Sequence, residues 1–264
     1  MCVVDHMLYV KGVTQLRDVV YIVVLGFLAI KMFNSKTHQE LRSITTPDFR
    51  YPLDIVACQQ TSQLYVSDSY KYIWRVSADG EDVRRWLSVS ASDTFKPWKL
   101  SVRSARLLVT SYRTGQLTQF DAGGNELRRV QLPDDMRPQH AVESPAGTFI
   151  ISQYRSQLKH SVSEVNTAGE VLRQFSGSLG LSPHIAVDSR GTVLVADQDN
   201  RRILLLDSRL SLRRIIIDER QLDYKEPYHI CYAEPSGRLL VVLHTAQPVM
   251  NGFRQVAVFD MLCR

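Results

Sequence analysis

Three histidines occupy similar places in successive segments of the chain, and together they could hold a metal ion. His140, His184 and His229 each follow a proline by one or two residues and precede a short apolar run. Three imidazoles that leave one coordination position open are a ligand set of catalytic zinc. Such chemistry requires a fold that brings three separate segments to one point.

A second set of residues pairs aromatic or basic side chains in polar segments. The four pairs are Tyr70-Lys71, Tyr112-Arg113, Tyr154-Arg155 and Arg201-Arg202. A ring beside a cation suits single-stranded RNA, because rings stack on bases at about 1–3 kcal/mol each while cations hold phosphate. Tyrosine and arginine are also common anchors of protein–protein interfaces. Both partner classes therefore stay open, with a protein partner weighted above RNA.

Both sets of residues belong to a unit of four short strands that recurs along the chain. Its clearest copy is VLVADQDNRRILLLD at 193–207, and its third strands end at Asn34, Ser77, Asp121, Asn166, Asp207 and Asp260. The copies follow one another roughly every forty to fifty residues, a period typical of β-propeller blades. Turn residues such as Asp79-Gly80 and Gly123-Gly124 separate the strands.

Six such units predict an all-β, six-bladed β-propeller of four-stranded antiparallel blades within one domain, 1–264. The expected blades lie near 11–45, 51–90, 95–133, 138–177, 181–222 and 227–264. The entry strand of the first blade falls somewhere in residues 6–17. The last unit supplies three clear strands, so residues near Met7–Val10, within a possible closing strand at 1–10, are expected to return and join the N- and C-terminal strands.

The fifth unit, PHIAVDSRGTVLVADQDNRRILLLD at 183–207, resembles the NHL repeat, and LYVSDSYKYIWRVSADG at 64–80 is similar to it. The resemblance implies a propeller like that of tripartite-motif ubiquitin ligases and translational repressors, some of which bind RNA. No RING finger, B-box or coiled coil is apparent in the sequence. Asp197 and Asn200 are expected to cap the turn between two strands, and Ile203 and Leu205 to point inward between blades.

In a propeller, the loops between second and third strands and the connections between blades share one face, which we call the loop face. The four residue pairs above lie on loops 67–72, 110–115, 152–160 and 196–202, and so on this face. The outermost strands carry Arg84-Arg85, Arg128-Arg129 and Arg213-Arg214. Charges at such positions form a solvated rim that prevents edge-to-edge pairing.

Innermost strands line the central channel, so the three histidines could meet at its mouth. Peptide-amidating lyases, which look like six-bladed relatives, use zinc-binding histidines in a comparable Pro-His setting. However, matching AVES (141–144) with AVDS (186–189) sets His140 opposite Ile185. Because side chains alternate between the two faces of a strand, this offset of one residue would turn one of His140 and His184 away from the channel.

Lactonase-like propellers would instead hold calcium through acidic groups, for which only Asp54, Glu143 and Asp188 are near candidates. A zinc or calcium enzyme therefore remains the alternative. The favoured prediction has no catalytic residue and no cofactor.

The bulk composition is that of a globular protein: 264 residues, 44% hydrophobic, 22% charged, with a net charge of +5. The apolar run Val19–Ile30 is too short to span a membrane, which needs about 20 residues, and predicts two buried strands around Gly26. Four cysteines without metal-ligand spacing suggest a reduced, cytoplasmic setting. The sequence predicts a non-catalytic recognition or scaffold module for a protein or single-stranded RNA, with no membrane and no small-molecule substrate favoured.

Overall fold

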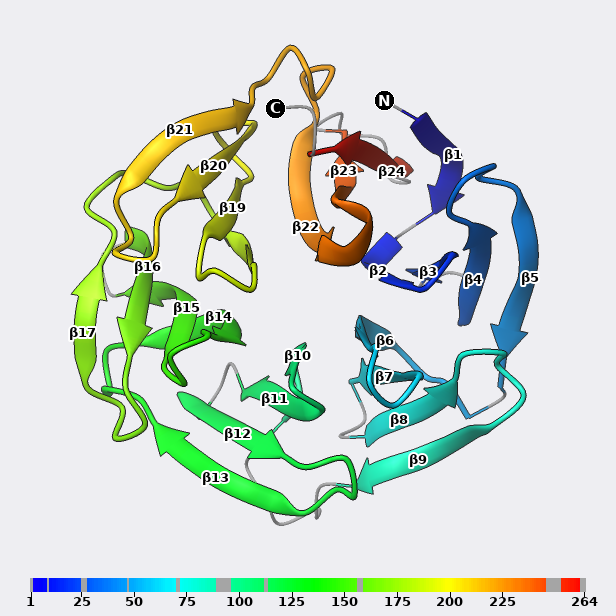
Figure 1. Cartoon of the computed structure of the whole chain (residues 1–264), viewed down its shortest axis with the longest axis horizontal. Coiled ribbons are helices and arrows are strands. Elements are labelled where there is room, and N and C mark those ends of the chain that lie inside the picture. Colours follow the sequence, from blue (N-terminus) through cyan, green and yellow to red (C-terminus); the bar gives the residue numbers. More distant parts are fainter. Residues whose placement is uncertain are drawn as a thin grey trace.

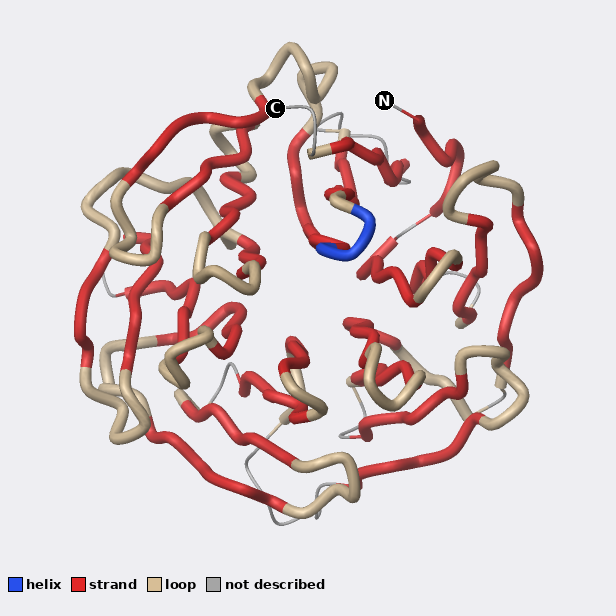
Figure 2. Tube along the Cα trace, viewed as in Figure 1, coloured by secondary structure: helices blue, strands red, loops and turns tan. Residues whose placement is uncertain are grey.

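The computed structural model describes residues 2–8, 10–24, 28–46, 48–69, 72–88, 96–111, 114–155, 159–245 and 253–261. Its strands form six antiparallel sheets of four strands each, arranged radially around a central axis (Figure 1). Within the described residues the only helix is a single 3-10 turn at Glu234–Ser236 (Figure 2). The predicted all-β, six-bladed propeller is confirmed.

Each of the first five blades takes its strands from one continuous segment, running from the channel outward. Blade one contains β2 (Val10–Leu16), β3 (Val19–Val24), β4 (Ala29–Asn34) and β5 (Glu40–Thr45). Blade two contains β6 (Pro52–Cys58), β7 (Gln63–Asp68), β8 (Tyr72–Ser77) and β9 (Val83–Ser88). Blade three contains β10 (Lys99–Arg103), β11 (Arg106–Ser111), β12 (Gln116–Phe120) and β13 (Glu126–Gln131). Blade four contains β14 (Arg137–Glu143), β15 (Phe149–Arg155), β16 (Lys159–Val165) and β17 (Val171–Gln174). Blade five contains β18 (His184–Val187), β19 (Val193–Asp197), β20 (Arg202–Leu206) and β21 (Leu212–Ile217).

The sixth blade closes the ring by joining the two ends of the chain. It contains β22 (Glu226–Ala233), β23 (Arg238–His244) and β24 (Phe253–Asp260), and its outermost strand is β1 (Cys2–Leu8). β1 runs antiparallel to β24, with Cys2 opposite Val258 and Leu8 opposite Phe253. Closure by the N-terminal strand is confirmed, although the strand begins earlier than Met7, and Val10 belongs to β2 instead.

Burial falls from the inner strands to the outer ones. The second strand of a blade is covered on both sides by its neighbours, so β19 is buried at all five positions. By contrast, β17 is exposed at all four of its positions. The core therefore lies between adjacent blades, and the outer strands meet solvent with charged side chains such as Arg129, which pairs with Glu126 at 2.7 Å.

The apolar run at 19–30 supplies β3 and the start of β4, as predicted, while Gly26 lies outside the described residues. No helix in the described part of the chain is long and apolar enough to cross a membrane. Cys58 and Cys231 carry free thiols. The side chains of Cys2 and Cys263 lie outside the description.

The turn between β16 and β17 of blade four lies against the backbone of blade three at Gly169. Gly169 has φ +87°, and a Cβ there would lie 2.1 Å from the carbonyl oxygen of Gln131 in the preceding blade. We expect Gly169→Ala to lower the free energy of unfolding by more than about 2 kcal/mol, because a positive-φ cost adds to a backbone clash. Urea denaturation measures this loss.

Gly147→Ala is the matched control. Gly147 has φ +79° but nothing within 4 Å of its Cβ position. This variant should lose only the conformational cost of about 1–2 kcal/mol. Equal losses in the two variants would show that the approach of blade four to Gln131 is not as close as described.

Candidate functional site

The innermost strand of each blade places one residue at the same level of the channel, near the loop face. Each of these residues directly precedes a buried aliphatic residue that is at most 2% exposed, namely Val13, Ile55, Leu100, Ala141, Ile185 and Ile230. We call the six positions the channel ring: Gly12, Asp54, Lys99, His140, His184 and His229. The structure thus gathers five polar side chains from five blades.

The three histidines of the channel ring lie side by side. The ring centroids of His140 and His184 are 4.0 Å apart with an interplanar angle of 18°, and those of His184 and His229 are also 4.0 Å apart. All three side chains are at most 5% exposed. The three histidines therefore do meet in the channel, which the sequence offered only as a possibility.

The expectation that one of His140 and His184 turns away from the channel is wrong. The two strands are equivalent when matched on the turns that follow them, Gly147-Thr148 and Gly191-Thr192, and this match sets His140 opposite His184. Gln139 is an extra residue between Pro138 and His140, at which the ladder slips register. From His140 and from His184 to the following turn the ladder runs without interruption, so both histidines point the same way, and matching AVES with AVDS was one residue out of register.

Asp54 is the anion of the channel ring, and three donors surround it. Its Oδ1 accepts from His229 Nε2 at 2.9 Å and lies 3.5 Å from Lys99 Nζ, while its Oδ2 accepts from the Leu100 backbone N–H at 2.8 Å. Burial alone would raise the pKa of Asp54, but the Lys99 ammonium and the His229 hydrogen bond hold that pKa well below its usual range. Gly12 faces this group, since a Cβ there would lie 3.1 Å from Oδ1.

Sequence reasoning named Asp54 only as a weak calcium ligand and missed Lys99 and Gly12. A signal for Lys99 was present, because Pro52 and Pro97 precede Asp54 and Lys99 by two residues, as Pro138 precedes His140. Gly12 has no such proline and could not be found in this way.

Side chains of the channel ring join neighbouring blades. Beside the Leu100–Asp54 bond, the Ile185 N–H donates to His140 Nδ1 at 3.5 Å, and the Ile230 N–H donates to His184 Nδ1 at 3.4 Å. One edge of each innermost strand has no strand partner, so its N–H groups need other acceptors. Asp54, His140 and His184 each supply one such acceptor to the following blade.

These contacts define the protonation of two histidines. Because His140 Nδ1 accepts, its Nε2 carries the proton and donates to the Leu100 carbonyl oxygen at 3.2 Å. Burial lowers the pKa of His140 to about 4 and the pKa of His184 well below its ordinary value. Both imidazoles are therefore neutral at pH 7.

Three side chains of the channel ring are of the types that bind metal ions and lie close together. Ligand atoms of Asp54, His184 and His229 lie within 4.8 Å of one another, close enough for one cation. However, Asp54 Oδ1 already accepts from His229, and the Lys99 ammonium 3.5 Å away would repel a divalent cation. The donor set fits a hydrogen-bonded structural cluster better than a metal site.

Below the channel ring lies a cavity of about 160 Å³ with mainly aliphatic walls. Its one thiol, Cys231, lies 3.8 Å from Thr14 Oγ1, and burial raises the pKa of that thiol. A thiol is a poor nucleophile compared with a thiolate. The thiol of this cavity is therefore not activated for nucleophilic attack.

The three carboxylates considered for calcium do not come together. Glu143 accepts from Arg106 and Gln119, each at 2.7 Å, at the far end of its strand from the loop face. Asp188 caps a turn by accepting from the Thr192 N–H at 2.7 Å. Asp54 lies at the opposite, loop-face end, so these three carboxylates do not form one calcium site.

The loop-face pairs are described only in part. Tyr70, Lys71, Tyr112 and Arg113 lie outside the described residues, and of Arg155 only the backbone is described. Tyr154 is half-buried and packs on His160 with ring centroids 5.4 Å apart. Arg201 lies in a turn with φ 47°.

The side chain of Arg202 forms an ion pair with Asp197, the residue that was expected to cap this turn. Arg202 Nε lies 2.8 Å from Asp197 Oδ2, and Asn200 Nδ2 donates to both carboxylate oxygens at 3.0 Å. The Gly180 N–H donates to Asp197 Oδ1 at 2.8 Å. Asp197 and Asn200 thus have a structural role, but Asp197 binds the backbone of Gly180 outside its own turn, and Asn200 binds the Asp197 side chain rather than the turn backbone.

Ile203 and Leu205 point to the same side of β20, as predicted, and both pack in the cluster between blades five and six, whereas Leu204 and Leu206 belong to the cluster on the other side. Ile203, Leu204 and Leu206 are all buried, whereas Leu205 is only partly buried. Because neighbouring blades cover both faces of a blade, alternation does not separate an inside from an outside here.

A pocket of about 560 Å³ lies on the loop face beside Tyr154. It is lined by His160, Gln174, Phe175, Ser176, Gly177, Ser178 and Leu179, and we call it the loop-face pocket. Phe175 and Leu179 form an apolar floor, while Gln174, Ser176 and Ser178 are exposed at its rim. Neither ring nitrogen of His160 has a hydrogen-bond partner among the described residues.

No protein-family model and no curated protein sequence matches this chain. Among solved structures, it is similar to a gluconolactonase from Xanthomonas campestris (TM-score 0.70, 15% identity, 97% of this chain and 88% of that chain). It is also similar to virginiamycin B lyase from Staphylococcus aureus (TM-score 0.66, 14% identity, 95% and 80%) and to a chain of the nidogen–laminin complex (0.64, 14%, 80% and 81%). These similarities show the propeller fold alone, which enzymes and binding proteins share. The NHL family specifically is not confirmed.

Proposed function

We propose that this propeller is a non-catalytic recognition module that binds a protein partner through its loop face. The observation that carries the proposal is the loop-face pocket, which lies beside Tyr154 where the sequence predicts an interface. Its volume of about 560 Å³ falls within the range of about 300–1,000 Å³ that ligand pockets occupy.

The chemistry of the pocket suits a protein side chain. Phe175 and Leu179 offer an apolar floor, and the neighbouring Leu181 is 51% exposed. His160 and Gln174 add polar groups at the edge. An apolar centre inside a polar rim is the usual anatomy of a protein–protein interface.

Local charge favours a protein over single-stranded RNA as the partner. Arg202, one of the predicted phosphate contacts, is paired with Asp197. Asp199 is exposed and accepts from the Leu181 N–H at 2.9 Å. Burial lowers the pKa of His160, and the nearby Asp199 carboxylate partly opposes this shift. If RNA bases stacked on the rings of Tyr154 and His160, the RNA phosphates would lie near the Asp199 carboxylate, which repels them.

The channel supports the non-catalytic part of the proposal. Asp54, His140 and His184 accept hydrogen bonds from the next blade, so an enzyme that used them would give up contacts between blades.

Peptide selection tests the loop-face pocket. We would select peptides from a random displayed library on the immobilised propeller and measure their affinity by fluorescence anisotropy. Ser176 is exposed at the pocket rim, so Ser176→Trp should fill the mouth without disturbing the core and weaken binding at least tenfold. Ser43→Trp, at an exposed serine on the outermost strand of blade one, is the matched control and should bind normally.

The same preparation distinguishes a protein from RNA. A labelled, randomised single-stranded RNA pool is expected to bind at low salt and to dissociate at physiological salt, because net charge alone attracts it. RNA binding that persists at physiological salt, and that is lost in the Tyr112→Ala, Arg155→Ala double variant, would contradict the proposal. Selected peptides that ignore Ser176→Trp would also contradict it.

A further inference from the structure

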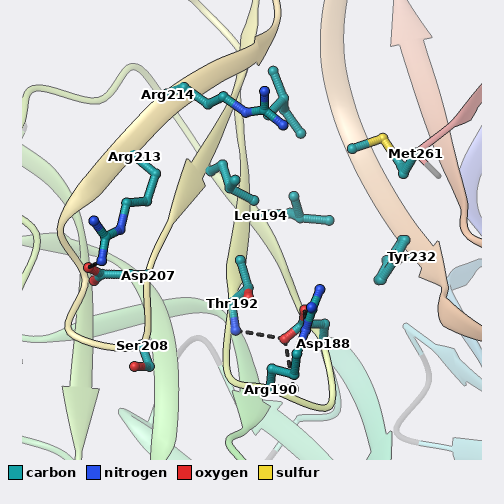
Figure 3. A pocket seen from close by; sticks show the side chains of 12 residues that line it. Asp188, Arg190, Thr192, Leu194, Asp207, Ser208, Arg213, Arg214, Tyr232 and Met261 are labelled. Atoms are coloured by element: carbon teal, nitrogen blue, oxygen red, sulfur yellow. Dashed lines mark hydrogen bonds and ion pairs between the residues drawn. The ribbon is translucent and has the colours of Figure 1, made fainter. Parts of the chain in front are cut away.

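A second pocket, of about 460 Å³, lies between blades five and six on the face opposite the loop face (Figure 3). It is bordered by the turn after β18 and the turn after β20, which lie at the other end of blade five from the loop at 198–201. We call it the inter-blade pocket.

The floor of the inter-blade pocket is an opening in the core. Leu194 and Ile216 are 4% and 7% exposed and belong to the cluster that joins blades five and six. Leu205, Tyr232 and Met261 pack against the same cluster but are only partly buried. Figure 3 shows Leu194, Tyr232 and Met261 around one space, reached from strands of both blades. Apolar surface thus remains uncovered where two blades meet.

Two of the three arginines at the rim are already neutralised. Arg213 pairs with Asp207 at 2.9 Å, and Arg190 lies 3.5 Å from Asp188. Both aspartates also accept backbone N–H groups of their own turns, which fixes them in place.

Arg214 is the remaining cation of the rim. It lies opposite Leu205 in the β20–β21 ladder, and Figure 3 shows its side chain extending from β21 to a position above Leu194 in that view. It forms no ion pair with any residue in the described ranges. The interpretation of Arg213-Arg214 as a solvated rim is therefore incomplete, because both line a pocket with one net positive charge.

We propose that the inter-blade pocket binds a segment of a partner protein that inserts one large apolar side chain between blades five and six and places a carboxylate beside it on Arg214. The apolar floor supplies affinity by removing surface from water, and the arginine selects acidic neighbours of the inserted side chain. This pocket and the loop-face pocket lie on opposite faces, so the two proposals succeed or fail separately.

Methyl NMR tests this inference, because the pocket floor carries its own probes. In protein labelled at isoleucine, leucine and methionine methyls, the peptide acetyl-Gly-Asp-Phe-Glu-Gly-amide at millimolar concentration should shift Leu194, Leu205, Ile216 and Met261. Arg214→Glu should weaken that peptide at least tenfold and let a peptide with lysines in place of the two acidic residues bind instead. Arg128→Glu, an exposed arginine on the outermost strand of blade three, is the matched control and should change neither affinity.

The inference is overturned if the acidic peptide shifts no methyl of the floor, or if Arg214→Glu leaves its affinity unchanged. Thermal unfolding of Arg214→Glu should match that of the unaltered protein, because no ion pair to a described residue is lost. The Ser176→Trp variant should bind the acidic peptide normally, and loss of binding there would assign the peptide to the loop-face pocket.

Discussion

Replacing Asp54 by alanine is expected to lower the free energy of unfolding by about 3–5 kcal/mol, the cost of breaking a buried ion pair. Asp54 is fully buried and accepts from His229 Nε2 and the Leu100 N–H, with Lys99 Nζ nearby. Its removal leaves a buried ammonium without a counter-charge and a backbone N–H without an acceptor. Urea denaturation at pH 7 measures the loss.

A double variant separates the charge from the packing. Lys99→Met removes the ammonium but keeps an apolar stem of similar length, so Asp54→Ala combined with Lys99→Met should recover part of the loss. If Asp54→Ala costs less than about 1 kcal/mol, the channel ring is not a structural joint, and its carboxylate would have to be explained by ligand binding.

The fold was predictable because its signals are local. Each blade is a continuous segment whose turns are marked by residues such as Gly80 and Gly191, which adopt positive φ. Closure was harder, because β1 pairs with β24 at the other end of the chain and no turn between them fixes the register. The sequence therefore indicated closure by a strand within residues 1–10, which contains β1, but centred that strand near Met7–Val10 rather than at Cys2–Leu8.

The channel was predictable in its residues but not in their arrangement. His140 and His184 were found from neighbouring prolines, yet similarity of the letters AVES and AVDS outweighed the turn geometry that sets the register. Lys99 and Gly12 can be recognised as members of the channel ring only when the innermost strands of the six blades are compared in three dimensions. The inter-blade pocket could not be predicted, since its floor is contributed by segments as distant as Leu194 and Met261.

The unfolding free energy is expected to fall as the pH drops from 6.5 to 4, by about 3 kcal/mol from His140 alone. An unfolded histidine binds its proton near pH 6.5, whereas burial lowers the pKa of folded His140 to about 4, with Lys99 and His229 opposing protonation and Asp54 favouring it. Between these values the unfolded state binds more protons, so acid favours unfolding. His184 adds to the loss in the same direction.

The pH dependence can be assigned to His140 by substitution. His140→Gln removes the titrating group. The unfolding free energy of this variant should therefore fall by about 3 kcal/mol less between pH 6.5 and 4 than that of the unaltered protein. Gly147→Ala, which changes no titratable group, should keep the full dependence. Asp54 acts outside this window, because a lowered carboxyl pKa costs stability only as the pH falls below about 3.8. A flat profile from pH 6.5 to 4 would mean that the histidines of the channel ring are protonated in the folded protein, and the hydrogen bonds assigned between blades would then be wrong.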